Sequence, residues 1–599
     1  MGKNDKKNAN ASPKAKSQHS RYSEDAATAP YNFIFQPEST KSYCEETITD
    51  TYSGDIVCSL ENLTPMLVAG ASNRDDKKDP NKFFFKVEDD YVIPGTSLKG
   101  LLRTVVETIS FSKIDPVSSS PIFWRNIIGK TKTGEQNSNT ATLYKDEFDD
   151  DIHGGFIQKV GSRYYFYECK VTRDSSKDHP SKPITAHSAD EESFSNKDYL
   201  YTGPMVSNTE GKNNGKTIRR AYKFTPLNEA PILLDKEVIS NFKKQLEPCK
   251  DQQSVWKYDY EKFLHGEKAR VFYNKKVNGK IDKIGTARYF RIPHSKVPSD
   301  LVGVVDCSKD FSKQLFGYIS KSEKGIFAKK GKVRVSSCYL NNCKEEVPVK
   351  VVLGAPKPSC VQHYLFQEKN RSVIAEKMKK GNVSIDDFFL YSKGSQIRGR
   401  KFYWHRDNDV DGYYGDDSVK DSESILHPIK AGATGDFKVS FIGVSEYELG
   451  AVLEALSFDD YGGAYKLGMG KPYGFGSVKI KIKALNVCKD SDRYQNLMNR
   501  LETPDSCITE EQLKKQVEIF VSSFKDKIKD KVLAKQDFDS NQSIEQLRII
   551  SNYHERPNNE DTAYMPLSDR DRPGCSSSYS QNKILPLIND VRNPKTKRK

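Results

Sequence analysis

The residues best suited to chemistry gather in one polar loop, residues 71–82 (ASNRDDKKDPNK). Three carboxylates, Asp75, Asp76 and Asp79, stand there among three lysines and an arginine. Carboxylate oxygens are the ligands that Mg²⁺ and Mn²⁺ prefer, and a cation held beside a phosphate polarises it and stabilises the leaving oxygen. The loop is therefore a candidate site for metal-dependent phosphodiester cleavage. The alternative interpretation is an ordinary solvated loop.

A second candidate is a glycine-rich loop, residues 461–477 (YGGAYKLGMGKPYGFGS). Glycine lets the main chain approach another backbone closely, and successive N–H groups can cradle phosphates. Lys466 and Lys471 add positive charge, and the interleaved aromatic residues offer stacking surfaces. We predict that the loop contacts nucleic acid through these two lysines and through Gly468, Gly470, Gly474 and Gly476. A tight turn that packs a helix against a sheet is the alternative.

Cysteine and histidine give weaker signals. The eleven cysteines are scattered, which is typical of reduced thiols, and only Cys338, Cys343, Cys360 and His363 suggest a zinc set. Their long middle gap is unlike a structural zinc site, so we predict no bound zinc. His405 lies in KFYWHRDN and is a candidate general base, although its aromatic neighbours favour a packed position.

The elements that must position these residues are strand–helix units. An alternating strand begins near Gly54, and the segment TSLKGLLRTVVETIS (96–110) has apolar residues at helical spacing, with Lys99 and Arg103 on its opposite side. Near the other end, FKVSFIGV (437–444) alternates as a strand, and Ser445 with Glu448 predicts a capped helix before the glycine loop and a last strand. Such units predict an α+β fold with a ferredoxin-like or RRM-like sheet.

The rest of the chain follows from composition and periodicity. Thr509 caps a predicted amphipathic helix within a C-terminal helical appendage. The predicted organisation is a disordered tail (1–30), a first strand–helix unit (54–112), insertions and the remaining strands (113–435), a strand–helix–glycine loop–strand unit (436–484), the appendage (485–554) and a disordered basic tail (555–599). The sequence does not decide whether residues 113–435 also contain a second, degenerate copy of the predicted α+β domain.

The basic but mixed composition fits a protein that meets polyanions along certain faces. The 599 residues hold 95 Lys and Arg against 81 Asp and Glu, a formal net charge of +14. Residues 265–296 mix basic residues with Phe272, Tyr273, Tyr289 and Phe290, a pattern that suits single-stranded RNA, or a solvated hairpin with its aromatic residues turned inward. No apolar stretch approaches a membrane span, so we expect a soluble, cytoplasmic protein without a membrane partner.

Five segments in order resemble the RAMP superfamily of CRISPR-associated proteins. Two hallmark segments of the family resemble IPGTSLKGLLR (93–103) and KLGMGKPYGFGSVKI (466–480). Between them, the family has a Leu-Phe-Gly turn followed by a strand, which resembles LFG (315–317) followed by GKVRVSSCYL (331–340). LGAPKPSCVQHYL (353–365) and RGRKFYWH (398–405) are similar to a large-insert subfamily found in type III systems.

The resemblance implies a subunit that holds CRISPR RNA (crRNA) and pairs it with a complementary target RNA beside other effector subunits. It implies that Lys99, Arg103 and the glycine loop contact the guide backbone. Backbone subunits of this kind often cut target RNA with an aspartate between the first strand and the first helix, a position that Asp79 matches best and Asp76 second. The alternatives are a crRNA-processing endoribonuclease that uses histidine and a purely structural RNA-binding subunit. Mg²⁺ or Mn²⁺ is expected only if this chain cuts RNA.

Overall fold

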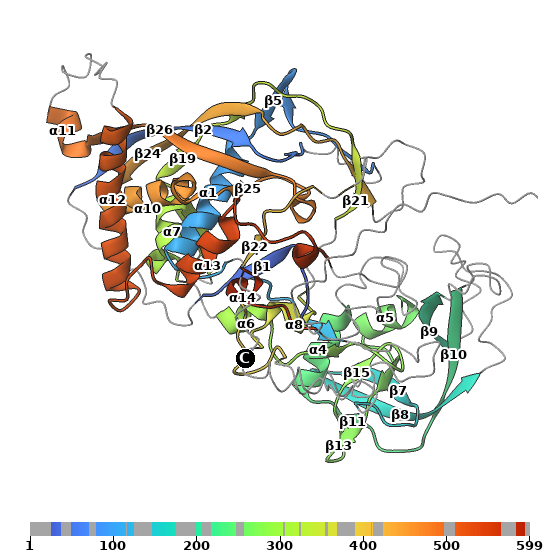
Figure 1. The fold of residues 1–599 in the computed structure, drawn as a ribbon. Coiled ribbons are helices and arrows are strands. Elements are labelled where there is room, and N and C mark those ends of the chain that lie inside the picture. The colour runs from blue at the N-terminus through green and yellow to red at the C-terminus, as the bar shows by residue number, and fades with distance from the viewer. Residues whose placement is uncertain are drawn as a thin grey trace, which may run out of the picture.

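A computed structural model describes most of the chain, and Figure 1 shows it as a mixed α+β protein. The described residues are 26–36, 50–70, 79–115, 117–124, 147–174, 199–206, 217–246, 257–302, 306–322, 325–353, 358–367, 390–408, 410, 423–495, 509–564 and 583–592. The α+β class predicted from the sequence is confirmed.

A five-stranded antiparallel sheet forms the centre of the fold. Its order is β19 (Val333–Val335), β24 (Thr434–Val444), β2 (Tyr52–Asn62), β26 (Ser477–Lys489) and β25 (Tyr465–Lys466). With α1 (Gly95–Ile109) after β2 and α10 (Glu446–Leu456) after β24, the chain runs β-α-β-β-α-β, the ferredoxin-like order. The strands alternate as predicted: Ile56, Cys58 and Leu60 are buried on one face of β2.

Helices cover that apolar face (Figure 1). Ser445 and Glu448 form the predicted capping box of α10, and Lys332 binds the Glu448 carboxylate at 2.7 Å. Helix α12 (Glu510–Lys531) buries Phe520 and Phe524 against α10, and α13 (Gln542–Ser551) adds four buried aliphatic residues. The C-terminal helices are therefore part of the main hydrophobic core rather than an addition to its surface.

The insertion between α1 and β19 builds a second core. Seven strands form one sheet: β7 (His153–Val160), β8 (Arg163–Asp174), β9 (Tyr199–Val206), β10 (Thr217–Pro226), β11 (Ile232–Leu233), β12 (Ala269–Tyr273) and β15 (Ile284–Gly285). Helices α4 (Lys236–Leu246) and α5 (Lys257–Leu264) accompany it. Phe272, Tyr273 and Phe290 are all less than 5% exposed, so these three rings face inward and the prediction that they stack on RNA is wrong for them, whereas Tyr289 is half-buried.

The remaining elements are short. Up to residue 302 they are β1 (Tyr31–Ile34), β3 (Asn81–Lys82), β4 (Lys86–Val87), β5 (Asp90–Ile93), β6 (Phe123–Trp124), β13 (Lys276–Val277), β14 (Lys280–Ile281), β16 (Ile292–Pro293) and α6 (Pro298–Val302). After it come η3 (Cys307–Lys309), α7 (Phe311–Phe316), β17 (Gly317–Ser322), β18 (Gly325–Lys330), β20 (Cys338–Tyr339), β21 (Val349–Val352), α8 (Val361–Tyr364), β22 (Arg400–Tyr403), β23 (Glu423–Leu426), η6 (Phe458–Tyr461), η7 (Lys471–Tyr473), α11 (Asp490–Gln495), η9 (Glu560–Thr562) and α14 (Ile588–Arg592).

The two ends of the chain correct the sequence-based interpretation. Residues 26–30 were expected in a disordered tail, yet Ala27 donates its backbone N–H to the Ile584 carbonyl at 3.0 Å, and Ala29 is buried. Residues 583–592 were expected in the other tail, yet they include α14 and bury Leu585 and Ile588. The two segments pack against each other, and each provides apolar contacts for the other. Neither segment's own sequence indicates this pairing. Within the described residues, no helix is both long and apolar enough to span a bilayer.

Candidate nucleic-acid interface

The first hallmark segment places a basic surface at the start of α1. A Cβ atom on Gly95 would lie 2.3 Å from the Val335 carbonyl oxygen, so glycine permits the close approach of α1 to the end of β19. That approach brings Lys99 near Arg334, and burial together with Arg103 and Arg334 lowers the pKa of the Lys99 ammonium. Among the described residues, no carboxylate lies within 4 Å of Lys99 or Arg334. Two neighbouring cations thus have no counter-ion within the described part of the chain, which favours an anionic ligand.

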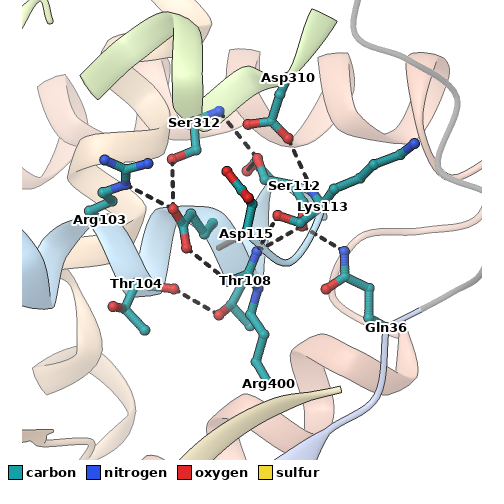
Figure 2. Close-up of polar contacts among 12 residues, drawn as sticks. Gln36, Arg103, Thr104, Thr108, Ser112, Lys113, Asp115, Asp310, Ser312 and Arg400 are labelled. Atoms are coloured by element: carbon teal, nitrogen blue, oxygen red, sulfur yellow. Dashed lines mark hydrogen bonds and ion pairs between the residues drawn. The ribbon is translucent and has the colours of Figure 1, made fainter. Parts of the chain in front are cut away.

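Arg103 has a different environment, as Figure 2 shows. Its Nε donates to Glu107 Oε1 at 2.8 Å, one turn along the helix. The other Glu107 oxygen accepts from Arg400 Nη1 at 2.8 Å, and Arg400 also donates to the Ser112 carbonyl. The buried Glu107 therefore ties α1 to β22 and neutralises part of the Arg103 charge.

The hairpin of β17 and β18 lies beside this surface and pairs with no other described strand. Three large apolar side chains on it are exposed: Ile319 (73%), Ile326 (70%) and Phe327 (55%). Lys330 is exposed at its base. An aromatic ring and a cation exposed on one two-stranded ribbon suit a single-stranded nucleic acid.

The glycine loop is closed on its own protein. Gly468, Gly470, Gly474 and Gly476 all have φ between +71° and +91°, the left-handed region that glycine favours. A Cβ atom on Gly468 would lie 2.2 Å from the Leu67 carbonyl oxygen, and one on Gly476 would lie 1.8 Å from that of Leu467. Met469 N–H donates to the Leu67 carbonyl at 2.8 Å. The close backbone approach that glycine allows is therefore made to residues of the same chain.

The two lysines of this loop are also turned inward or half-buried. Lys466 Nζ donates to the carbonyl oxygens of Gly474 and Phe475 at 3.2 and 3.1 Å, and burial lowers its pKa. Lys471 is half-buried, and burial lowers its pKa too. The loop contacts residues 65–68 and 406–407, whereas the start of α1 contacts residues 335–336. The two hallmark segments thus have different neighbours.

Asp79 lies at the start of β3 and is the one candidate carboxylate among the described residues, because Asp75 and Asp76 lie outside them. Its Oδ1 accepts from the Asn81 backbone N–H at 2.8 Å and from Asn81 Nδ2 at 2.9 Å, and these bonds lower the pKa of this half-buried carboxyl. Its Oδ2 has no partner within the described part of the chain.

A histidine that sequence reasoning missed stands next to Asp79. The Nε2 atom of His427 lies 2.9 Å from Asn81 Oδ1, and the ring stacks on Phe83 at 4.2 Å between centroids. Phe83 is 59% exposed. Asn81 therefore links the Asp79 carboxylate to an imidazole and an exposed aromatic ring. The parallel pairing of β3 with β23, which spans more than 300 residues, brings them together, and no local pattern indicated it.

The other candidates are packed inside the protein. Both ring nitrogens of His405 lie within hydrogen-bond distance of internal acceptors or hydroxyls, at 2.9 Å from Ser477 Oγ and 3.1 Å from the Ala464 carbonyl. Burial holds its pKa well below the ordinary value. His363 lies 3.2 Å from the Tyr31 hydroxyl, and burial lowers its pKa to about 3. Within the described residues, no three His, Cys, Asp or Glu side chains form a group that could hold a metal ion.

The comparison with protein families agrees with the motifs. The family model of the RAMP superfamily matches residues 59–479, and the chain belongs to this superfamily of CRISPR-associated proteins. A comparison with curated proteins finds no match. Among solved structures, the crystal structure of Csc2 from Thermofilum pendens matches with 10% identity and a TM-score of 0.22, covering 83% of this chain and 88% of that one. Because a TM-score of 0.22 carries no argument, the family assignment rests on the match to the family model.

Proposed function

We propose that this chain binds crRNA as a subunit of a type III CRISPR effector complex and holds the guide for pairing with target RNA. The observation that carries the proposal is a pair of neighbouring cations, Lys99 of α1 and Arg334 of β19, for which the described residues supply no counter-ion. Membership of the RAMP superfamily supports RNA as the polyanion. The exposed Phe327 beside this surface supplies an aromatic face on which a base can stack.

Filter binding of single-stranded RNA over a salt series tests the proposal. Each phosphate contact releases counter-ions and adds about 0.7 to the slope of log K against log salt. We expect a measurable slope and a guide RNA of uniform length that copurifies with the complex. A chain that binds no RNA at low salt and carries none after purification would refute the function.

Cleavage of the target RNA is a separate part of the proposal, with Asp79 as the catalytic candidate and Asp76 as the second. The Oδ2 atom of Asp79, which has no partner among the described residues, can ligate a cation, and Mg²⁺ is usually bound by one or two carboxylates together with substrate phosphates. A single half-buried carboxylate therefore fits Mg²⁺ or Mn²⁺ that arrives with RNA. The cation would supply charge stabilisation at the phosphate. Asp79 itself would position it, since Asn81 fixes the orientation of the carboxylate.

Asp79→Ala tests the cleavage proposal in the assembled complex. We expect metal-dependent cutting of complementary RNA to be lost while guide and target binding stay nearly intact. Asp90→Ala, which changes an exposed aspartate of β5, is the matched control. If the triple Asp75→Ala, Asp76→Ala, Asp79→Ala variant still cuts, or the wild type never cuts with Mg²⁺ or Mn²⁺, the subunit is a structural RNA-binding protein.

A histidine-dependent crRNA-processing enzyme is the other candidate function. His405 gives it no support, because the ring is buried and both nitrogens face partners inside the protein. Divalent-metal dependence distinguishes the two enzymes, since only the aspartate site requires a cation.

A further inference from the structure

A pocket of about 450 Å³ lies where α1, α7 and the first residues of β17 meet. Its polar lining includes Arg103, Thr104 and Glu107 of α1, Asp115 and Lys313, with Tyr318 and Ile319 as the less polar wall. Pockets of 300 to 1,000 Å³ that combine an apolar wall with a few placed polar groups are typical of small-ligand sites. This one opens beside the basic surface of Lys99, one helical turn from Arg103.

The charges inside the pocket balance. Arg103 is paired with Glu107 at 2.8 Å, and Lys313 Nζ is paired with Asp115 Oδ2. A phosphate placed between them would meet two carboxylates as well as two cations. The pocket therefore favours a neutral ligand that both donates and accepts hydrogen bonds over a bare anion.

Several polar atoms of the lining keep unused hydrogen-bonding capacity. Only Nε of Arg103 is engaged among the described residues, which leaves its two Nη groups as a planar fork (Figure 2). In the same described part, Asp115 uses Oδ2 alone, so Oδ1 can accept. Thr104 donates its hydroxyl proton to the Gly100 carbonyl and keeps its oxygen as an acceptor. A ligand for this site thus needs adjacent acceptors for a guanidinium and adjacent donors for a carboxylate.

We propose that the pocket receives one guanine base of a bound RNA strand. Guanine offers O6 and N7 as paired acceptors for an arginine fork. Its N1–H and N2–H groups are adjacent donors, which Asp115 accepts through Oδ1 and through the second lone pair of Oδ2 beside Lys313. Adenine lacks both pairs. Tyr318 and Ile319 supply a face for the ring. The proposal rests on the RNA-binding function above and adds base selection to it.

The test uses four uridine-rich 12-mers that carry a single central G, A, C or U, with affinities measured by fluorescence anisotropy. The wild type should bind the G strand roughly tenfold more tightly than the A strand, the discrimination typical of one bidentate contact. Asp115→Asn should remove this preference and leave the affinities for A, C and U unchanged. Asp526→Asn, an exposed change on α12, is the matched control. Thr104→Val provides a second variant should Asp115→Asn unfold the protein.

The outcomes separate this proposal from the function on which it rests. If no strand binds, RNA binding itself fails. If all four strands bind equally, RNA binding stands and the guanine pocket is refuted. GMP is added as a competitor to distinguish a guanine within an RNA strand from a free guanine nucleotide. Competition by GMP without any preference among the strands would assign the pocket to a free nucleotide and overturn the RNA assignment.

Discussion

The start of α1 and the glycine loop are the two segments that mark this family in the sequence, yet they differ in the structure. At the start of α1, Lys99 and Arg334 approach each other without a described counter-ion. In the glycine loop, Lys466 binds carbonyl oxygens of its own loop, and Gly468 packs on the Leu67 carbonyl. The comparison shows that one family motif places a lysine beside a second cation, while the other is packed against its own chain.

Gly476→Ala should have the largest effect, a loss of unfolding free energy. A harmless substitution would contradict the contrast between a packed glycine loop and the neighbouring cations at the start of α1. Alanine there would adopt φ near +71° and place Cβ against the Leu467 carbonyl, so we expect a loss of about 2 to 5 kcal/mol of unfolding free energy. Urea unfolding measures it. Gly432→Ala is the control: its φ is also positive, but its surroundings are open, so only about 1 to 2 kcal/mol should be lost. Equal losses in both variants would show that the loop is not packed as described.

The double variant Lys99→Gln, Arg334→Gln sharpens the other half of the comparison. Removing two surface cations should weaken RNA binding roughly tenfold at moderate salt and reduce the salt slope by about 1.4, because each lost phosphate contact removes about 0.7. Unfolding stability should be nearly unchanged. Filter binding at several salt concentrations measures both quantities, and an unchanged slope would remove this surface from the RNA path.

Acid should weaken the glycine-loop region through His405. Burial holds its folded pKa well below 6.5, so the folded protein resists protonation that the unfolded chain accepts. The unfolding free energy therefore keeps this contribution above pH 6.5. It decreases as the pH falls below 6.5, by up to about 1.4 kcal/mol per pH unit. His405→Gln should be less stable at pH 7.5 but should lose stability less steeply. Urea midpoints from pH 7.5 to 5 provide the measurement, and parallel curves for the two proteins would contradict the assignment.

Lys471→Gln should have the smallest effect. Lys471 is half-buried in a loop that contacts its own chain, so its neutralisation should change RNA affinity less than twofold and leave the salt slope within error. A drop in slope of about 0.7 would return the glycine loop to the RNA interface, as the sequence predicted.

The sequence predicted those features that are local. The 3–4 spacing from Leu98 to Ile109 marks α1, and the Ser445–Glu448 spacing marks the start of α10, because both depend on neighbours within one or two turns. The partners of the functional side chains escaped prediction because they come from afar. Glu107 meets Arg400, and Asn81 meets His427, across hundreds of residues. Charge counts along the sequence therefore overestimated the exposure of Lys466 and the freedom of Arg103.

The position of β2 in the centre of the sheet has a consequence for how the chain is made. Both neighbours of β2, which ends at Asn62, begin only at Thr434 and Ser477. At about 5 to 20 residues per second, a ribosome needs roughly 20 to 70 seconds to supply the first of them. Until then this apolar strand has no sheet to join, whereas the inserted sheet between 153 and 285 can complete itself. Nascent chains should therefore engage chaperones through their earliest strand, and slowing translation after residue 285 should lower the yield of folded protein more than slowing it before residue 150.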